Sequence, residues 1–184
     1  MATRKHLFVA GVSTALLSLS AIGFGALSAP SDAHVTFQAS GPGGLTIEGT
    51  TADLKVSEDS GNVVIDVPLA NLNTGIELRD HHMREKYLEV PKFPSTTLII
   101  SRGALKFPAK DDHAEGDVPA ILKLHGQSRP VTVHYEAKGG PAGFSAKGKF
   151  RLNMNDYGIS VPSYLGVTVK PDVGVSASFN VTGS

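Results

Sequence analysis

His81, His82 and Glu85 are the residues whose types and spacing come nearest to a reactive or metal-binding group. On a helix, His81 and Glu85 would share a face because residues four apart are neighbours there, and imidazole and carboxylate groups both bind zinc. The sequence supplies no third ligand in a recognisable pattern and no His-Glu-x-x-His motif. A solvated helix face that includes Arg79 explains the same residues. A metal-binding protein or a hydrolase therefore stays an alternative interpretation.

The other histidines and the acidic residues give weaker signals. His125 and His134 fall on the polar faces of two strands that a short turn would pair, so they could meet across the ladder, although simple surface positions explain them better. His34 could chelate copper only as the mature N-terminus and with a partner histidine. One acidic run lacks the order of a calcium-binding loop, and we interpret it as a solvated hairpin tip. This run contains Asp111, Asp112, His113, Glu115 and Asp117.

The composition excludes several classes of protein. The chain has no cysteine, which excludes disulfides, zinc–thiolate centres, iron–sulfur clusters and a cysteine nucleophile. Its 184 residues include 17 basic and 17 acidic side chains, so there is no basic excess of the kind that binds nucleic acid. The sequence contains no nucleophile elbow, phosphate-binding loop or dinucleotide fingerprint. We therefore expect neither nucleic-acid binding nor a cofactor.

The first 33 residues have the pattern of a secretory signal peptide. Arg4 and Lys5 precede an apolar run, and small residues follow it up to Ala33. An uncleaved membrane anchor is the alternative, but the small residues at the end of the run favour cleavage between Ser28 and Ala33. The sequence thus predicts a signal peptide over 1–33, one domain over 34–184, and a periplasmic or secreted location.

The rest of the chain alternates between apolar and polar residues, which is the pattern of half-buried β-strands. The clearest run extends from Val167 to Val181, where apolar residues occupy odd positions. Turns rich in Gly and Pro separate about eight such runs, and we interpret a change of phase after Gly49 as a β-bulge. Residues 77–88 hold good helix formers and are followed closely by prolines, which predicts one short helix. Strands with one apolar face suit a closed barrel or a sandwich.

Segments of the sequence resemble the YceI family of exported bacterial proteins. They are Leu72-Asn73-Thr74-Gly75-Ile76-Glu77-Leu78-Arg79-Asp80-His81-His82-Met83-Arg84 with Tyr87-Leu88-Glu89-Val90-Pro91-Lys92-Phe93-Pro94, then Leu122-Lys123-Leu124-His125-Gly126-Gln127-Ser128-Arg129-Pro130-Val131, and finally Asp156-Tyr157-Gly158-Ile159. Each motif alone is weak, but their order and spacing behind a predicted signal peptide are specific. The resemblance covers essentially all of 34–184. Met154 departs from the pattern, because the family often has Arg at that place.

The resemblance implies both a fold and a function. It implies an all-β fold, an extended eight-stranded antiparallel lipocalin-like barrel with one short helix. Family members bind a long isoprenoid chain in the lumen, such as a polyprenyl phosphate or a quinone tail, so we expect a non-enzymatic periplasmic carrier with transient membrane contact. The departure at Met154 bears on contacts to the ligand's head group more than on the fold. Candidates for the lumen, besides Val64 or Ile65, are Phe37, Leu54, Leu98, Ile100, Leu122, Leu124, Val133, Tyr135, Phe144, Phe150, Val167, Val169, Val175 and Phe179.

The residues alone leave alternatives open. Inward-facing apolar residues of a barrel either line a cavity or fill a core, and a filled barrel would suit a stress-response interaction module. The sequence also leaves open the ligand's chain length and head group and the oligomeric state, a dimer included. We predict that Gly75, Arg79 and Asp80 hold the helical segment in place and do not act in catalysis, because Gly permits the turn and the charged groups can anchor the segment by hydrogen bonds.

Overall fold

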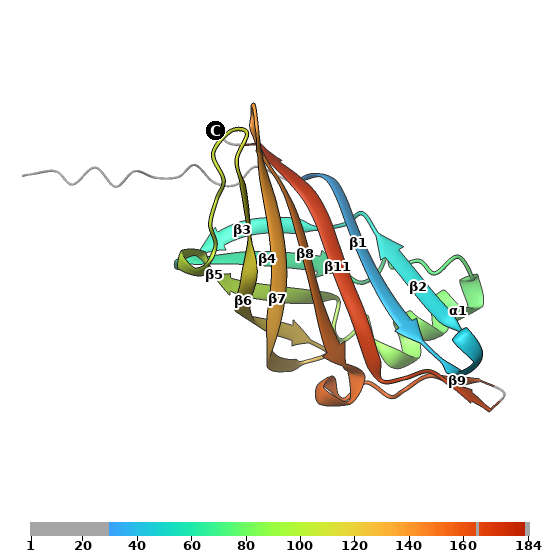
Figure 1. The fold of residues 1–184 in the computed structure, drawn as a ribbon. Helices are drawn as coiled ribbons and strands as arrows, with labels where there is room; N and C mark the ends of the chain where they lie inside the picture. The colour runs from blue at the N-terminus through green and yellow to red at the C-terminus, as the bar shows by residue number, and fades with distance from the viewer. Residues whose placement is uncertain (1–29, 165, 183–184) are drawn as a thin grey trace, which may run out of the picture.

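The computed structural model describes residues 30–164 and 166–182, most of whose strands form one curled antiparallel sheet (Figure 1). Nine strands follow the order β2-β1-β11-β8-β7-β6-β5-β4-β3. The predicted all-β, lipocalin-like class with one short helix is confirmed, with nine strands in the sheet instead of eight and a separate hairpin, β9–β10. The strands are β1 (Ser31–Ser40), β2 (Thr46–Thr51), β3 (Lys55–Asp59), β4 (Asn62–Pro68), β5 (Ser95–Ser101), β6 (His113–Leu124), β7 (Gln127–Gly140), β8 (Gly143–Asn153), β9 (Ser163–Tyr164), β10 (Val167–Thr168) and β11 (Asp172–Thr182).

The helical segment lies where the sequence predicts it. The α-helix α1 (Glu77–His82) continues directly into a π-helical turn, η2 (Met83–Tyr87). The short 3-10 turns η1 (Pro42–Gly44), η3 (Arg102–Ala104) and η4 (Met154–Tyr157) connect strands. Among the described residues, no helix has the length and apolar character needed to cross a membrane.

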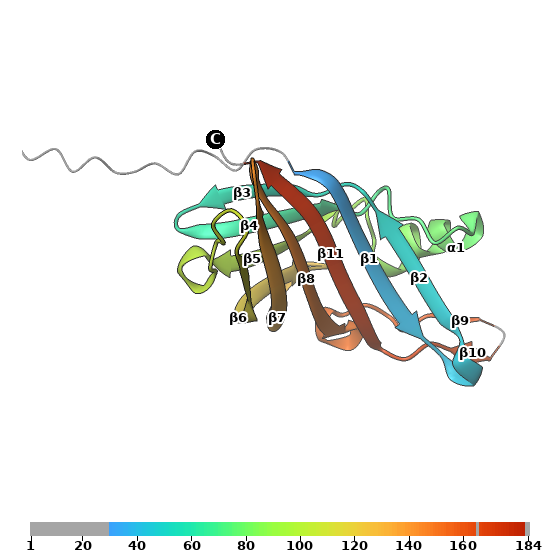
Figure 2. The ribbon, with the colours of Figure 1, turned by 45° about the horizontal axis from the view of Figure 1, so that its top comes forward.

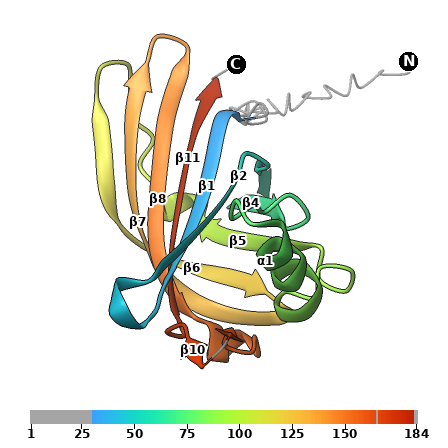
Figure 3. The ribbon, with the colours of Figure 1, turned by 90° about the vertical axis from the view of Figure 1, so that its right-hand side faces the viewer.

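A short connection makes the sheet curl upon itself. β2 and β3 lie at opposite edges of the sheet, yet only residues 52–54 join them. Because an extended chain covers at most about 3.6 Å per residue, the two edges lie within about 15 Å of each other at this corner. Figure 3 shows the curl of the sheet, with α1 on the side of β2 and β4.

The segment that leads into α1 continues the sheet at the β2 edge. The backbones of Thr50 and Asn73 exchange two hydrogen bonds, of 2.8 and 2.9 Å. Across the described part of the chain, β2 and β3 themselves are not neighbours in the hydrogen-bonded order. The helical segment therefore covers the edge of a sheet that does not close into a barrel by backbone pairing.

The change of phase after Gly49 is not a β-bulge, so this prediction is wrong. β2 pairs with β1 in continuous register from Thr46 to Thr51. The residues that follow form β3, which pairs with β4 at the far edge. The alternation changes phase because two strands that are distant in the sheet follow one another closely in the sequence. Gly49 instead allows a close approach, since the ring of Phe37 occupies the place of a Cβ atom at this position.

The predicted final strand is interrupted, which also corrects the sequence analysis. Val167 lies on β10 and Val169 on the link that follows, and β11 begins only at Asp172. The hairpin formed by β9 and β10 lies at the same end of the molecule as η1 (Figure 2). The amide of Lys170 donates a 2.6 Å hydrogen bond to the carbonyl oxygen of Ser40, which holds this link against the end of β1.

The predicted signal peptide, 1–33, lies outside the described residues apart from 30–33. Residues 31–33 already belong to β1, and the side-chain amide of Asn180 on β11 donates a 2.9 Å hydrogen bond to Asp32 Oδ2. Cleavage after Ala33 would therefore shorten β1, whereas cleavage at Ser28 or Ala29 would leave it whole.

The buried apolar residues gather in clusters along the inner face of the sheet. One surrounds Tyr157 where β6, η4 and β11 meet, a second joins β1, β3 and β4 around Val35 and Val63, and a third joins β5, β6 and β7 around Val133. These clusters form because the pleat directs every second side chain of each strand to the same face. Together they surround the interior that contains the candidate site.

Candidate ligand-binding site

The inner face of the sheet surrounds a cavity of about 780 Å³. Each strand of the nine-stranded sheet contributes apolar side chains to its wall. A cavity of this size falls within the range of roughly 300–1,000 Å³ that is usual for small-molecule sites. The polar residues on the wall are few: Thr74, Arg79, His82, Thr96, Lys106, Lys147 and Ser163. The site can therefore hold an apolar molecule with few polar contacts.

Every residue that the sequence predicts for the lumen lies on this wall. These residues are Phe37, Leu54, Leu98, Ile100, Leu122, Leu124, Val133, Tyr135, Phe144, Phe150, Val167, Val169, Val175 and Phe179. Of the two candidates on β4, Ile65 lines the cavity, while Val64 is not part of the wall. Val167 and Val169 reach the wall from outside the sheet. Their contact with a ligand stays a prediction.

The sequence analysis missed the part of the wall that the helical segment forms. Ile76 and Leu78 at the start of α1 line the cavity, as do Met83, Tyr87 and Leu88 in and after η2. Ile76, Met83 and Tyr87 recur at spacings of seven and four residues, which is the pattern of one helix face. This signal is present in the sequence and could have indicated that the helix covers the lumen.

A hydrogen-bonded group fixes the start of this helical segment. Asp80 is buried, and its Oδ1 accepts hydrogen bonds from the amide of Thr74 (2.8 Å) and from its hydroxyl (2.6 Å). Arg79 donates from Nε to Thr74 Oγ1 and from Nη2 to the Thr74 carbonyl oxygen, each at 2.7 Å. Gly75 has φ of 80°, a conformation that favours glycine. This geometry supports the positioning role predicted for Gly75, Arg79 and Asp80.

The segments that resemble the YceI motifs meet around His125. Its Nε2 lies 2.8 Å from Glu89 Oε2, and its Nδ1 lies 3.0 Å from the carbonyl oxygen of Tyr157. Both partner atoms are oxygens that accept hydrogen bonds. The ring of Phe93 packs against the imidazole, with 4.6 Å between centroids. These contacts tie the chain after the helix to the β6–β7 turn and to η4.

His125 and His134 do not meet, which excludes the cross-strand pair that the sequence left as the less favoured interpretation. His125 lies in the turn beyond the last ladder pair of β6 and β7, with φ of 50°. His134 is opposite Asp117 in the ladder, and its Nδ1 lies 2.8 Å from Asp117 Oδ1. The turn displaces His125 from the strand alternation that suggested the pair.

Tyr157 lies in η4, at the end of the barrel where β6, η4 and β11 meet, and is the most deeply buried large residue there. It is 1% exposed, and its hydroxyl has no hydrogen-bond partner in the described structure. Burial raises the pKa of the phenol above its ordinary value of 10.0; the charge of Asp156 raises it further, and Arg129 opposes the shift. Tyr157 is not part of the cavity wall, although Met154 and Ile159 beside it are. Its hydroxyl therefore belongs to the packing of the barrel end.

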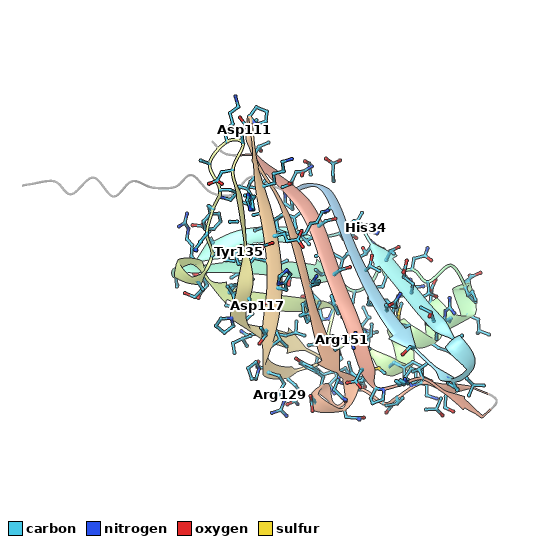
Figure 4. The ribbon with its side chains drawn as sticks, viewed as in Figure 1. His34, Asp111, Asp117, Arg129, Tyr135 and Arg151 are labelled. Carbon is cyan, nitrogen blue, oxygen red and sulfur yellow. The ribbon has the colours of Figure 1, made fainter. Side chains whose placement is uncertain are left out.

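The candidate metal ligands do not assemble into a site. Within 30–164 and 166–182, no three His, Asp or Glu side chains are grouped so that they could hold a metal ion. The rings of His81 and His82 lie 6.2 Å apart by centroid, and both residues and Glu85 are exposed. His34 is exposed on β1, opposite Ser178 of β11 (Figure 4).

The acidic run is a hairpin tip only in part. Asp111 and Asp112 lie in the turn, but His113, Glu115 and Asp117 are exposed residues of β6, and Figure 4 shows Asp117 well away from Asp111. The run is solvated, as predicted, and its carboxylates are spread along the strand.

A curled antiparallel sheet around an apolar cavity, with a helix covering one side, defines a lipocalin-like protein. The chain belongs to the YceI-like domain family, whose model matches residues 27–181. A UPF0312 protein of Pseudomonas fluorescens (strain SBW25) is 30% identical over 137 residues, which are 70% of this chain and 68% of that protein.

Solved structures share the fold at low sequence identity. A polyisoprenoid binding domain from Saccharophagus degradans, implicated in plant cell wall breakdown, matches with a TM-score of 0.71 and 17% identity, over 86% of this chain and 98% of that domain. BcnA from Burkholderia cenocepacia matches with a TM-score of 0.65 and 13% identity, over 82% of this chain and 96% of its own. These likenesses establish the architecture.

Proposed function

We propose that the protein is a periplasmic carrier that holds a long isoprenoid lipid, a polyprenyl phosphate or a quinone, in the cavity. The observation that carries the proposal is the wall, to which each strand of the sheet adds apolar side chains around about 780 Å³. Each buried methylene contributes about 0.8 kcal/mol, so an isoprenoid chain gains affinity there without polar contacts. Family membership, and the shared fold of a polyisoprenoid binding domain, favour the same class of ligand.

The proposed role is binding and not catalysis. Arg79 on the cavity wall bonds to Thr74, as does Asp80 beside it, and His125, which lies outside the wall, bonds to Glu89. Groups engaged in this way hold the helical segment and the barrel end in place. The ligand is therefore expected to leave the cavity chemically unchanged.

The periplasmic location in this proposal rests on the predicted signal peptide. Arg4, Lys5 and the apolar run after them are the features that support export. N-terminal sequencing of the exported protein is expected to show a new terminus between Ser28 and Ala33. An intact Met1 in the membrane fraction would contradict the location and leave the ligand proposal standing.

Mass spectrometry of an organic extract of the purified protein tests the ligand. We expect a co-purified prenyl lipid from the wild-type protein. Ala146 lines the cavity between Phe144 and Gly148 and pairs with Ala137 across the ladder, so its small side chain leaves space in the lumen. Ala146→Phe should fill this space and remove most of the lipid.

A matched variant separates filling of the lumen from addition of a ring. Ser145 precedes Ala146 on β8, and neighbouring side chains of a strand point to opposite faces. Ser145→Phe should therefore retain the lipid at the wild-type level. Equal lipid in the Ala146→Phe and Ser145→Phe proteins would place the lipid outside the cavity. A wild-type protein that yields no prenyl lipid and binds neither an added quinone nor a polyprenyl phosphate would overturn the proposal.

A further inference from the structure

Exposed apolar side chains from three separate segments surround one end of the cavity. Leu45 follows η1, Ile76 and Leu78 lie at the start of α1, and Val167 is on β10. These side chains are 39%, 52%, 62% and 42% exposed in that order, and all of them also line the cavity. Figure 2 shows η1, α1 and the β9–β10 hairpin at the same end of the molecule, away from β3. We call these residues the apolar rim.

The rim differs from ordinary surface hydrophobic residues. Single exposed aliphatic residues are normal on protein surfaces, and Ile121 is one, since it is 41% exposed and does not line the cavity. Phe107 is also exposed and lies on the wall, but it has a partner, because its ring packs edge-on against Phe144 with 5.6 Å between centroids. Each rim residue instead is exposed to solvent and also lines the lumen.

We propose that the apolar rim inserts into a lipid bilayer and opens the cavity to it. This inference rests on the proposed function, because a ligand that resides in a membrane has to pass from the bilayer into the cavity. The continuity of the rim with the cavity wall favours a bilayer over a protein partner. An isoprenoid chain could move along Leu78, Ile76 and the wall without exposure to water, which would otherwise oppose the transfer. A protein seated on the rim would close this path.

The charges beside the rim indicate how the contact is held. The helical segment from Ile76 to Lys86 balances its basic residues with acidic ones, namely Arg79, Arg84 and Lys86 against Glu77, Asp80 and Glu85. Attraction to anionic head groups is therefore small, and burial of the aliphatic rim in the interfacial region supplies the driving force. Binding to vesicles should consequently depend only weakly on salt and on anionic lipid.

Co-sedimentation with vesicles tests the rim. The probes are vesicles of phosphatidylcholine alone and of phosphatidylcholine mixed with phosphatidylglycerol. The variant with Ile76→Ser and Leu78→Ser should partition to both about tenfold less than the wild-type protein, because it loses two large apolar side chains. Ile121→Ser removes an exposed apolar side chain outside the cavity and should bind both kinds of vesicle as the wild-type protein does.

A fluorescent reporter tests insertion directly. The chain has no tryptophan, so Leu78→Trp introduces a single one at the rim. Its emission should shift to shorter wavelength when vesicles are added, since the ring moves from water into the interfacial region. The matched reporter, Ile121→Trp, should show no shift.

Binding of farnesyl phosphate in solution separates this inference from the proposed function. Ala146→Phe fills the lumen and leaves the rim unchanged, so it should lose most of its farnesyl phosphate binding and still bind both kinds of vesicle within about twofold of the wild-type protein. Loss of vesicle binding in Ala146→Phe, or wild-type vesicle binding in the Ile76→Ser, Leu78→Ser variant, would overturn the proposed insertion of the rim. A wild-type protein that binds neither kind of vesicle would overturn it too. A wild-type protein that binds no isoprenoid, but whose Leu78→Trp reporter shifts, would contradict the proposed function and support the rim.

Discussion

Tyr157 buries a hydroxyl that has no hydrogen-bond partner in the described structure. An unsatisfied buried hydroxyl costs about 1–3 kcal/mol, so its removal relieves a penalty. Tyr157→Phe keeps the ring that fills the barrel end and should leave the free energy of unfolding unchanged or raise it by about 1 kcal/mol. Denaturant titration measures this difference. A clear loss of stability would show that the hydroxyl makes a bond.

The raised pKa of Tyr157 predicts a loss of stability at alkaline pH. Burial raises the pKa of Tyr157 in the folded protein above the value of 10.0 for an exposed phenol. Above about pH 10 the unfolded chain releases this proton while the folded protein still holds it, so the unfolded state binds fewer protons and stability falls as pH rises. Below about pH 10 the contribution is complete. Melting curves should show a shallower alkaline fall for Tyr157→Phe than for the wild-type protein, and equal slopes would contradict the assignment.

Asp80 holds the helical segment through a buried carboxylate. Asp80→Ala removes the acceptor of two hydrogen bonds from Thr74 and should lower the free energy of unfolding by about 1–3 kcal/mol. Asp80→Asn keeps one oxygen acceptor in the same shape and should cost less. Thermal unfolding of the two variants side by side measures the order. If Asp80→Ala melts like the wild-type protein, the carboxylate does not anchor the helix.

Only part of this residue-scale chemistry could be predicted from the sequence. The group formed by Thr74, Arg79 and Asp80 is local, so the short motif indicated a positioning role. His125 finds its partners at sequence separations of 36 residues to Glu89 and 32 to Tyr157. No local pattern specifies contacts of that range, because the folding of the sheet brings them together.

At the scale of elements, alternation located the strands but not all of their ends. Val169 and Val173 are an even number of positions apart, so apolar residues stay at odd positions across the interruption at Pro171. The alternation therefore does not show where β11 begins. After Gly49 the apolar residues change from odd to even positions, so that break can be recognised in the sequence. Its cause is not visible, because a bulge and a new strand at the far edge shift the phase alike.

The end of β7 makes a close approach that only glycine permits. Gly139 exchanges backbone hydrogen bonds with Asp111 and Asp112, and a Cβ atom at Gly139 would overlap the carbonyl oxygen of Ala109. Gly139→Ala should therefore push the loop before β6 away and cost about 1–3 kcal/mol of stability. Gly140→Ala is the matched control, because its Cβ would meet its nearest neighbour at an ordinary 3.6 Å. Denaturant midpoints that are equal for the two variants would contradict this packing.

At the scale of the whole molecule, the sequence could not distinguish a hollow barrel from a filled one. Both place apolar side chains on the inner face, and the periodicity of two is the same. The difference lies in how the side-chain volumes add up across strands. Ala137 on β7, Ala146 and Gly148 on β8 and Ala177 on β11 all line the cavity, and their small size leaves the space open. That sum depends on the register between strands that are distant in the sequence.

A hollow interior makes the stability of the whole molecule depend on its ligand. A ligand that binds only the folded protein stabilises it by about 2.7 kcal/mol at one hundred times its Kd. For a chain of this size, extraction of the lipid should lower the Tm of the wild-type protein by about 5–10 °C, and added lipid should restore it. Ala146→Phe fills the lumen with its own side chain, so its Tm should be nearly the same before and after extraction. Differential scanning calorimetry of the two proteins measures both shifts. A wild-type Tm that does not respond to extraction would show that the interior is not occupied by lipid in the folded protein.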